Sequence, residues 1–163
     1  MSEINFRKNY TFINNTIFTD NDIPLPVNID EEILYFTKNV TFYLQIGNGA
    51  PALTVRYSSY NGTVYITNYR VIYKPKISTK FFDSFFITFD RIISVDDDYS
   101  FDIAIEESYV GSVYIGFEES HKSVFYKVLK SMVNEFTSKE DTQGFLKIHC
   151  LYTVRLSKNK YRD

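Results

Sequence analysis

Apolar and polar side chains alternate through most of the chain between residues 31 and 117, in short runs that turn residues separate. A period of two places successive side chains on opposite faces, which is typical of half-buried β-strands. Runs of this length, bounded by Gly, Pro, Asn and Asp, are typical of a small sandwich or barrel. The predicted strand material lies in residues 33–35, 40–46, 53–57, 63–67, 70–74, 85–89, 92–95, 101–105 and 113–117.

The stretch GTVYITNYRVIYKP, from Gly62 to Pro75, has the sharpest pattern. It alternates, breaks at the polar residues 67–70, alternates again and stops at Pro75, which has no N–H to donate to a strand ladder. These features predict an antiparallel hairpin. The preceding Asn61-Gly62 pair predicts a further tight turn, because both residues tolerate positive φ.

The period changes near Ser120, which is a good helix N-cap. From there the apolar residues recur at three and four positions, which predicts an amphipathic helix over residues 120–136 that packs on the sheets. Its apolar residues are Val124, Phe125, Val128, Leu129, Met132, Val133 and Phe136. A polar linker follows, and residues 145–156 alternate again, which predicts an added strand after the helix.

The predicted fold is therefore mainly β: a barrel of two nearly orthogonal antiparallel sheets, capped at one end by the helix. A chain of 163 residues suits one domain. We expect residues 1–30 to form an N-terminal arm that packs through Phe12, Ile17 and Phe18, residues 31–137 to form the domain, and residues 138–163 to hold the linker, the added strand and a tail.

This order of elements resembles a pleckstrin-homology-like fold, and residues 62–73 resemble the hallmark hairpin of GRAM domains, a branch of that fold. Within GRAM domains the chain is most similar to the WW-domain-binding protein 2 family. The resemblance implies an adaptor that binds proteins or phosphoinositides and has no catalytic activity. The chain departs from that family in one respect: its prolines, Pro24, Pro26, Pro51 and Pro75, form no PPxY motif, so binding to WW domains is not implied.

Charge and cysteine content limit the classes of partner and the kinds of site that we expect, and the absence of long apolar segments bears on location. The net charge is -2 and the pI is about 5.7, so neither nucleic-acid binding nor a general attraction to anionic membranes is expected. The single cysteine, Cys150, allows no disulfide framework and no CxxC zinc pair. No signal peptide or membrane span is evident, so we expect an intracellular, cytoplasmic protein, with peripheral membrane and nuclear locations as alternatives.

A basic segment follows the hairpin and is backed by Phe81 and Phe82. Lysines can pair with headgroup phosphates while aromatic rings enter the membrane interface. The alternative is a solvated loop with buried phenylalanines, and for Arg70 a structural salt bridge; the first long loop, residues 47–52, has no basic residue, which weighs against lipid binding. The candidate headgroup residues are Lys74, Lys76, Lys80, Arg56 and Arg70.

A protein partner is the leading hypothesis. A peptide could add a strand to an exposed sheet edge or rest in a groove beside the helix, where Lys122, Lys127 and Lys130 are the candidate contact residues. The predicted function is thus a non-enzymatic protein-interaction module. The alternatives are a peripheral phosphoinositide-binding module and a nuclear transcription coactivator-type scaffold, and the pattern leaves the oligomeric state open.

No cofactor or metal site is expected. Asp96, Asp97 and Asp98 lack the EF-hand spacing, and His121 and His149 lack a zinc-binding spacing. No nucleophile or nucleotide-binding motif is present. Acidic pairs such as Glu31-Glu32 are expected at solvent-exposed strand ends.

Overall fold

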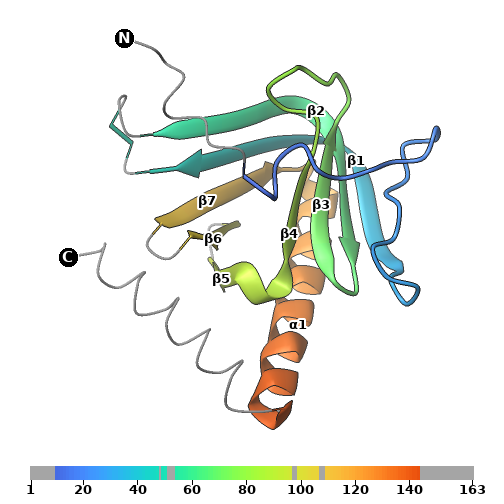
Figure 1. Ribbon diagram of the computed structural model, residues 1–163, viewed down its shortest axis with the longest axis vertical. Helices are drawn as coiled ribbons and strands as arrows, with labels where there is room; N and C mark the ends of the chain where they lie inside the picture. Colours follow the sequence, from blue (N-terminus) through green and yellow to red (C-terminus); the bar gives the residue numbers. More distant parts are fainter. Residues whose placement is uncertain (1–9, 48, 51–53, 97–98, 107–108, 144–163) are drawn as a thin grey trace.

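The computed structural model describes residues 10–47, 49–50, 54–96, 99–106 and 109–143, and its strands form one antiparallel sheet followed by a helix (Figure 1). Seven strands lie in the order β4-β3-β2-β1-β7-β6-β5. Their bounds are β1 (Ile33–Ile46), β2 (Val55–Thr67), β3 (Arg70–Pro75), β4 (Phe85–Thr88), β5 (Ile92–Val95), β6 (Ser100–Glu106) and β7 (Tyr109–Gly116), with a short 3-10 helix η2 (Phe89–Arg91) and the helix α1 (Glu119–Gln143).

The predicted fold class, mainly β with one C-terminal helix, is confirmed. It differs in one respect: the described strands form one seven-stranded sheet instead of two sheets, with no closed barrel. The two groups of strands are joined through β1, which is 14 residues long and pairs with β2 from Ile33 to Ile46. On its other side β1 pairs with β7 only from Thr41 onward. Register shifts on both sides of Val40 allow this long strand to bend, and Asn39 adopts a φ of 61° beside them.

The predicted turn at Asn61-Gly62 is also wrong, because both residues lie inside β2, a single strand of 13 residues. A Cβ on Gly62 would lie 2.4 Å from the carbonyl oxygen of Lys74 and 2.4 Å from the hydroxyl of Tyr73. The glycine therefore serves a close approach between neighbouring strands rather than a turn. The later turn is confirmed: β2 ends at Thr67 and β3 runs from Arg70 to Pro75.

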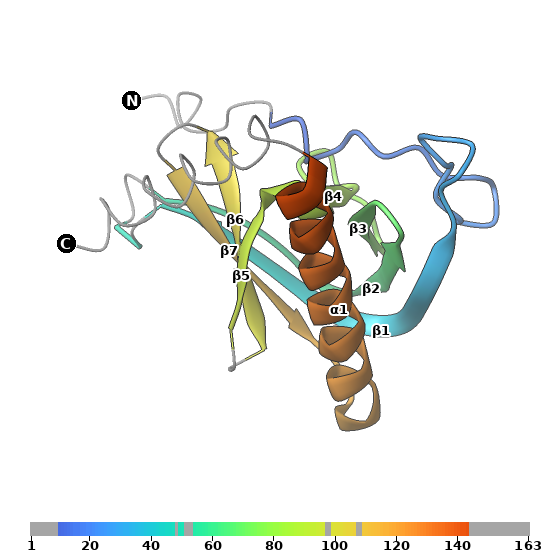
Figure 2. The ribbon, with the colours of Figure 1, turned by 90° about the horizontal axis from the view of Figure 1, so that it is seen from below.

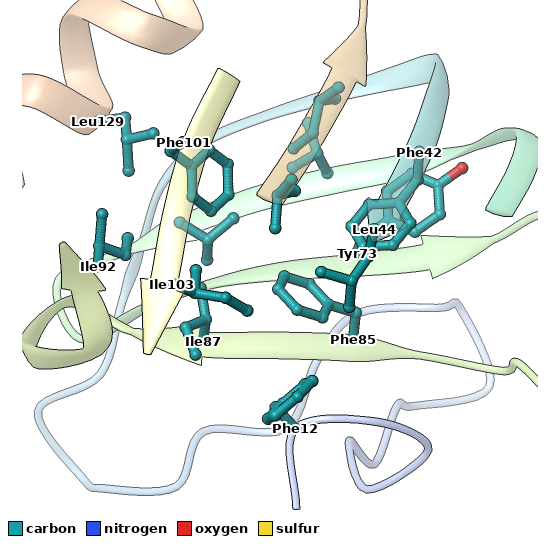
Figure 3. Close-up of a cluster of buried hydrophobic side chains, with 14 of the residues drawn as sticks. Phe12, Phe42, Leu44, Tyr73, Phe85, Ile87, Ile92, Phe101, Ile103 and Leu129 are labelled. Atoms are coloured by element: carbon teal, nitrogen blue, oxygen red, sulfur yellow. The ribbon is translucent and has the colours of Figure 1, made fainter. Parts of the chain in front are cut away.

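The core lies between the sheet and α1. In Figure 2, α1 crosses in front of the sheet, with β5, β6 and β7 on one side of it and β2, β3 and β4 on the other. Phe125 and Leu129 are fully buried, and Figure 3 places Leu129 beside Phe101. At the other end of the core, the ring of Phe42 lies 4.7 Å from that of Tyr73 and 4.9 Å from that of Phe85.

The helix differs from its expected form in two respects. It continues to Gln143 instead of ending near residue 136, and Val124, predicted on its buried stripe, is 44% exposed. The strand predicted over residues 145–156 lies outside the described residues.

The N-terminal segment packs on the sheet, as expected, and crosses the outer face of β2 and β3 (Figure 1). Ile13 forms a β-bridge with Phe85, and the N–H of Phe86 donates to the carbonyl oxygen of Phe12 at 3.0 Å. Phe12 is buried, but Ile17 is 69% exposed, so the predicted packing through Ile17 is wrong. Residues 10–30 are called the arm below.

Candidate functional site

A buried ion pair joins Glu31, the residue after the arm, to Arg70, the first residue of β3. The Nε atom of Arg70 lies 2.7 Å from Oε1 of Glu31, and these side chains are 4% and 3% exposed. Arg70 also donates from Nη2 to the carbonyl oxygen of Leu25 at 3.0 Å. Arg70 is therefore inaccessible to a headgroup, which removes it from the candidate lipid set, and Glu31 does not face solvent as its place in an acidic pair predicted.

Glu31 is held in its charged form. Burial alone would raise the pKa of its carboxyl group, but hydrogen bonds from Arg70 and from the backbone N–H of Val27, together with the charge of Arg70, outweigh burial and lower the pKa from its ordinary value of 4.5. The pair is thus an ionised structural contact rather than an acid–base group.

The Thr67-Asn68 turn explains why the hairpin carries these two polar residues. The Oγ1 atom of Thr67 accepts from the backbone N–H groups of Tyr69 and Arg70, both at 3.0 Å. The Nδ2 atom of Asn68 donates to the carbonyl oxygen of Asp30 at 2.8 Å, and its Oδ1 accepts from the N–H of Glu32 at 2.9 Å. The most distinctive part of the sequence motif therefore fastens the hairpin to the chain entering β1.

The candidate lysines after the hairpin differ in accessibility. The Nζ atom of Lys74 lies 3.4 Å from Oδ1 of Asp22 and 5.4 Å from the ring centroid of Phe18, so this cation is held against the arm. Lys76 and Lys80 are exposed.

Arg56 is exposed too, but it lies on β2 opposite Gln45, whereas Gly62 lies opposite Pro75. Six positions along a strand span roughly 20 Å, so β2 separates Arg56 from the lysines that follow Pro75.

The connection between β3 and β4, residues 76–84, is called the 76–84 loop below. Its side chains Ile77 and Phe81 are 81% and 51% exposed, whereas Phe82 is 5% exposed and contacts the ring of Phe42 at 5.3 Å. The expected alternative of buried phenylalanines thus holds for Phe82 and not for Phe81. Sequence reasoning missed Ile77; an isoleucine between two lysines in KISTK was the available signal.

Hydrogen bonds fix the backbone of the 76–84 loop. The Oγ1 atom of Thr79 accepts from the N–H groups of Phe81 at 3.3 Å and Phe82 at 3.1 Å. From the arm, Asn14 donates through Nδ2 to the carbonyl oxygen of Phe81 at 3.0 Å and accepts at Oδ1 from the N–H of Asp83 at 2.7 Å. The exposed apolar side chains therefore project from an ordered support.

The first half of β1 is a second accessible surface. Among the described residues, none pairs with β1 on the side opposite β2 before Thr41. Leu34 is 44% and Phe36 56% exposed there, and the ring of Phe36 stacks on that of Tyr65 with centroids 6.0 Å apart. An exposed sheet edge was predicted in general terms, but its position on β1 was not.

The candidate lysines on α1 are dispersed. Lys127 and Lys130 are exposed, while Nζ of Lys122 lies 4.4 Å from the ring centroid of Tyr99. Nearer the start of α1, Nδ1 of the exposed His121 lies 3.4 Å from the hydroxyl of Tyr35 on β1.

Two further observations bear on the kind of site. Within the part of the chain that the structure describes, no three His, Cys, Asp or Glu side chains come together in a group that could hold a metal ion. In the same residues, no helix has the length and apolar character needed to cross a bilayer.

The comparison with known proteins identifies the fold. Neither a protein-family model nor a curated protein matches the sequence. Among solved structures, the chain is similar to the Vps36 N-terminal PH domain, with a TM-score of 0.55 and 12% sequence identity over 78% of this chain and 96% of that one. The protein therefore has a pleckstrin-homology-like fold, the class to which its strand order and C-terminal helix had already pointed.

Proposed function

We propose that this domain is a non-enzymatic adaptor of GRAM type that binds an extended peptide of another protein along the first half of β1. The pleckstrin-homology-like fold supports an interaction module in general. The resemblance of residues 62–73 to the GRAM hairpin supports the narrower class, related to the WW-domain-binding protein 2 family but without its PPxY motif.

The unpaired half of β1 carries the proposal. An edge strand presents N–H and C=O groups that can template a further strand, and this mode of peptide binding takes its affinity from backbone hydrogen bonds. Here β1 is paired with β2 throughout but with β7 only from Thr41 onward. Leu34 and Phe36 lie on the same segment and offer apolar anchors. The expected ligand is an extended peptide with apolar side chains at alternate positions.

The helix lysines are a secondary part of the proposal. Lys127 and Lys130 are exposed on α1, and α1 begins near β1 through the contact of His121 with Tyr35. We expect acidic residues flanking the bound segment to contact these exposed lysines. Lys122 contributes less, because its ammonium group already lies over Tyr99.

The proposal is tested by selecting a random peptide library on the domain and measuring the affinity of the selected peptides. Phe36→Asp is expected to weaken binding at least about tenfold, since it replaces an anchor with a charge. Amide hydrogen exchange in residues 33–40 is expected to slow when a selected peptide is bound. The matched control is Tyr114→Asp, at a side chain of β7 that is 42% exposed.

Two results would contradict the proposal: selected peptides that bind Phe36→Asp as tightly as the parent protein, or protection confined to residues outside 33–40. Equal losses in Phe36→Asp and Tyr114→Asp would count against it as well, because the effect would then follow from added negative charge alone.

A further inference from the structure

The 76–84 loop combines two exposed apolar side chains with two exposed lysines. Ile77 is 81% and Phe81 51% exposed, and Nζ of Lys80 lies 4.9 Å from the ring centroid of Phe81. Lys76 is exposed beside Ile77. Apolar residues bordered by cations match the boundary between the acyl chains and the headgroups of a lipid bilayer.

We propose that the 76–84 loop inserts Ile77 and Phe81 into the surface of an anionic lipid bilayer, while Lys76 and Lys80 contact lipid phosphates. This inference goes beyond the proposed peptide binding and uses none of its residues. It concerns the bilayer surface and needs no pocket for a particular headgroup.

The charges of the loop favour an anionic surface. Two lysines are opposed by one acidic residue, Asp83, whose Oδ1 accepts from the hydroxyl of Ser84 at 2.9 Å. The nearby Lys74 pairs with Asp22 at 3.4 Å, so the accessible positive charge lies in the loop itself. A local cationic site of this kind can act although the net charge of the whole chain is -2.

The loop is ordered before it meets a membrane. Asn14 and Thr79 hold its backbone, and Phe82 anchors it in the core beside Phe42. Little conformational entropy is therefore lost on insertion. Tyr60, which is 96% exposed, adjoins this site, because the carbonyl oxygen of the next residue, Asn61, accepts from the N–H of Lys76 at 2.9 Å. Tyrosine is favoured at membrane interfaces.

A bilayer fits this loop better than a protein partner does. A stable protein interface covers about 800 Å² on each partner, which is far more than one short loop presents. A membrane needs only a few inserted side chains and nearby cations, and further contacts add to these.

The test uses the absence of tryptophan from the chain, because a single introduced tryptophan reports on its own surroundings. With Phe81→Trp, we expect a blue shift of the emission and slower quenching by acrylamide on adding vesicles of phosphatidylcholine and phosphatidylserine. The control Tyr114→Trp, on the exposed side chain of β7, is expected to show neither change.

Co-sedimentation with the same vesicles separates the two contributions. Ile77→Asp is expected to weaken binding at least about tenfold. Lys76→Ala and Lys80→Ala are each expected to weaken it about fivefold, which corresponds to about 1 kcal/mol per lysine. Phe36→Asp is expected to bind vesicles normally while losing the peptide, so failure of either proposal leaves the other testable. Circular dichroism verifies that each variant is folded.

Three outcomes would overturn the inference. The first is no change in Phe81→Trp emission with anionic vesicles. The second is equal binding to vesicles of phosphatidylcholine alone. The third is binding that requires phosphoinositide, is competed by soluble inositol phosphate and is unaffected by Ile77→Asp, which would indicate a headgroup site elsewhere.

Discussion

At the scale of single residues, the Glu31–Arg70 contact does the most to connect distant parts of the chain. Both side chains are almost fully buried, and the same guanidinium group also binds the arm at the carbonyl oxygen of Leu25. Removing one partner of a buried ion pair leaves an uncompensated charge, which costs more than the pair contributes. The contact is therefore a sensitive point for both stability and pH dependence.

We predict that Glu31→Gln lowers the free energy of unfolding by about 3 kcal/mol at neutral pH. The amide keeps the size of the side chain but leaves Arg70 without its counter-charge. Chemical denaturation measures this loss. The neighbouring Glu32 is exposed, and Glu32→Gln is expected to change stability by less than about 0.5 kcal/mol. Equal effects of the two substitutions would contradict the prediction.

The same pair predicts how stability responds to acid. Since the pKa of Glu31 is lower in the folded protein than its ordinary value of 4.5, the folded state binds fewer protons than the unfolded chain around that pH. The stabilisation is fully present above pH 4.5 and is lost as the pH falls through the lowered pKa. Unfolding measured between neutral pH and pH 3 should show a shallower acid decline in Glu31→Gln than in the parent protein.

The sequence allowed one half of this contact to be anticipated. A salt bridge was an expected alternative for Arg70, because the arginine opens a strand whose neighbours are apolar. Its partner Glu31 was not predicted, since the two residues meet only after β1, β2 and β3 have paired. A local charge pattern carries no information about such a contact.

At the scale of elements, the long β1 and β2 determine which surfaces are accessible. The alternating pattern located strand segments within β1 and β2 but predicted each strand as two shorter ones. The reason is that bulges interrupt the period of two where the strands bend. Periodicity predicted the hairpin turn after Thr67, the location of the strand material and the helix, but not the continuity of β1 and β2. The merger into one sheet was not predictable either, since it depends on how far β7 extends along β1.

The candidate surfaces were predictable to a similar degree. Lysines beside aromatics marked the 76–84 loop, but exposure separates Phe81 from Phe82, and only the packed core decides which of two adjacent rings is buried. The sequence pattern did not predict that the first half of β1 is a free edge, because an edge strand and a central strand can have the same alternation of apolar and polar residues.

The close contact between β2 and β3 gives an element-level prediction. Gly62→Ala is expected to lower the free energy of unfolding by about 3 kcal/mol, since the added Cβ would lie 2.4 Å from the backbone oxygen of Lys74 and from the Tyr73 hydroxyl. Thermal or chemical denaturation measures the change. Gly116→Ala is the control: its Cβ would lie no closer than 3.3 Å to Thr41, so a loss below about 1 kcal/mol is expected. A mild effect at Gly62 would contradict the contact.

At the scale of the whole molecule, the arm belongs to the folded unit. Phe12 and Ile13 are buried in the main core cluster, and the hydroxyl of Tyr65 donates to the carbonyl oxygen of Asp22 at 2.6 Å. Arg70 and Lys74 also contact the arm. Removing it would uncover both the edge of β4 and the outer face of β2 and β3.

We therefore predict that a chain beginning at Glu31 loses cooperative unfolding at room temperature, since loss of a buried phenylalanine alone costs about 3 to 5 kcal/mol. Thermal unfolding followed by circular dichroism measures this. Adding a peptide of residues 10–30 should restore part of the transition. An unchanged midpoint in the shortened chain would show that residues 1–30 are an accessory segment.

The pairing of β1 with β7 has a consequence for synthesis of the protein. Thr41 pairs with Gly116, and Ile13 forms a bridge with Phe85. Segments that are synthesised early therefore cannot pair until segments that are synthesised much later have been made. At translation rates of roughly 5–20 residues per second, β1 leaves the ribosome on the order of 10 s before β7. During that interval the second half of β1, from Thr41 onward, also lacks the neighbour that it has in the finished domain. The nascent chain therefore exposes more unpaired strand edge than the finished domain, and such edges favour aggregation.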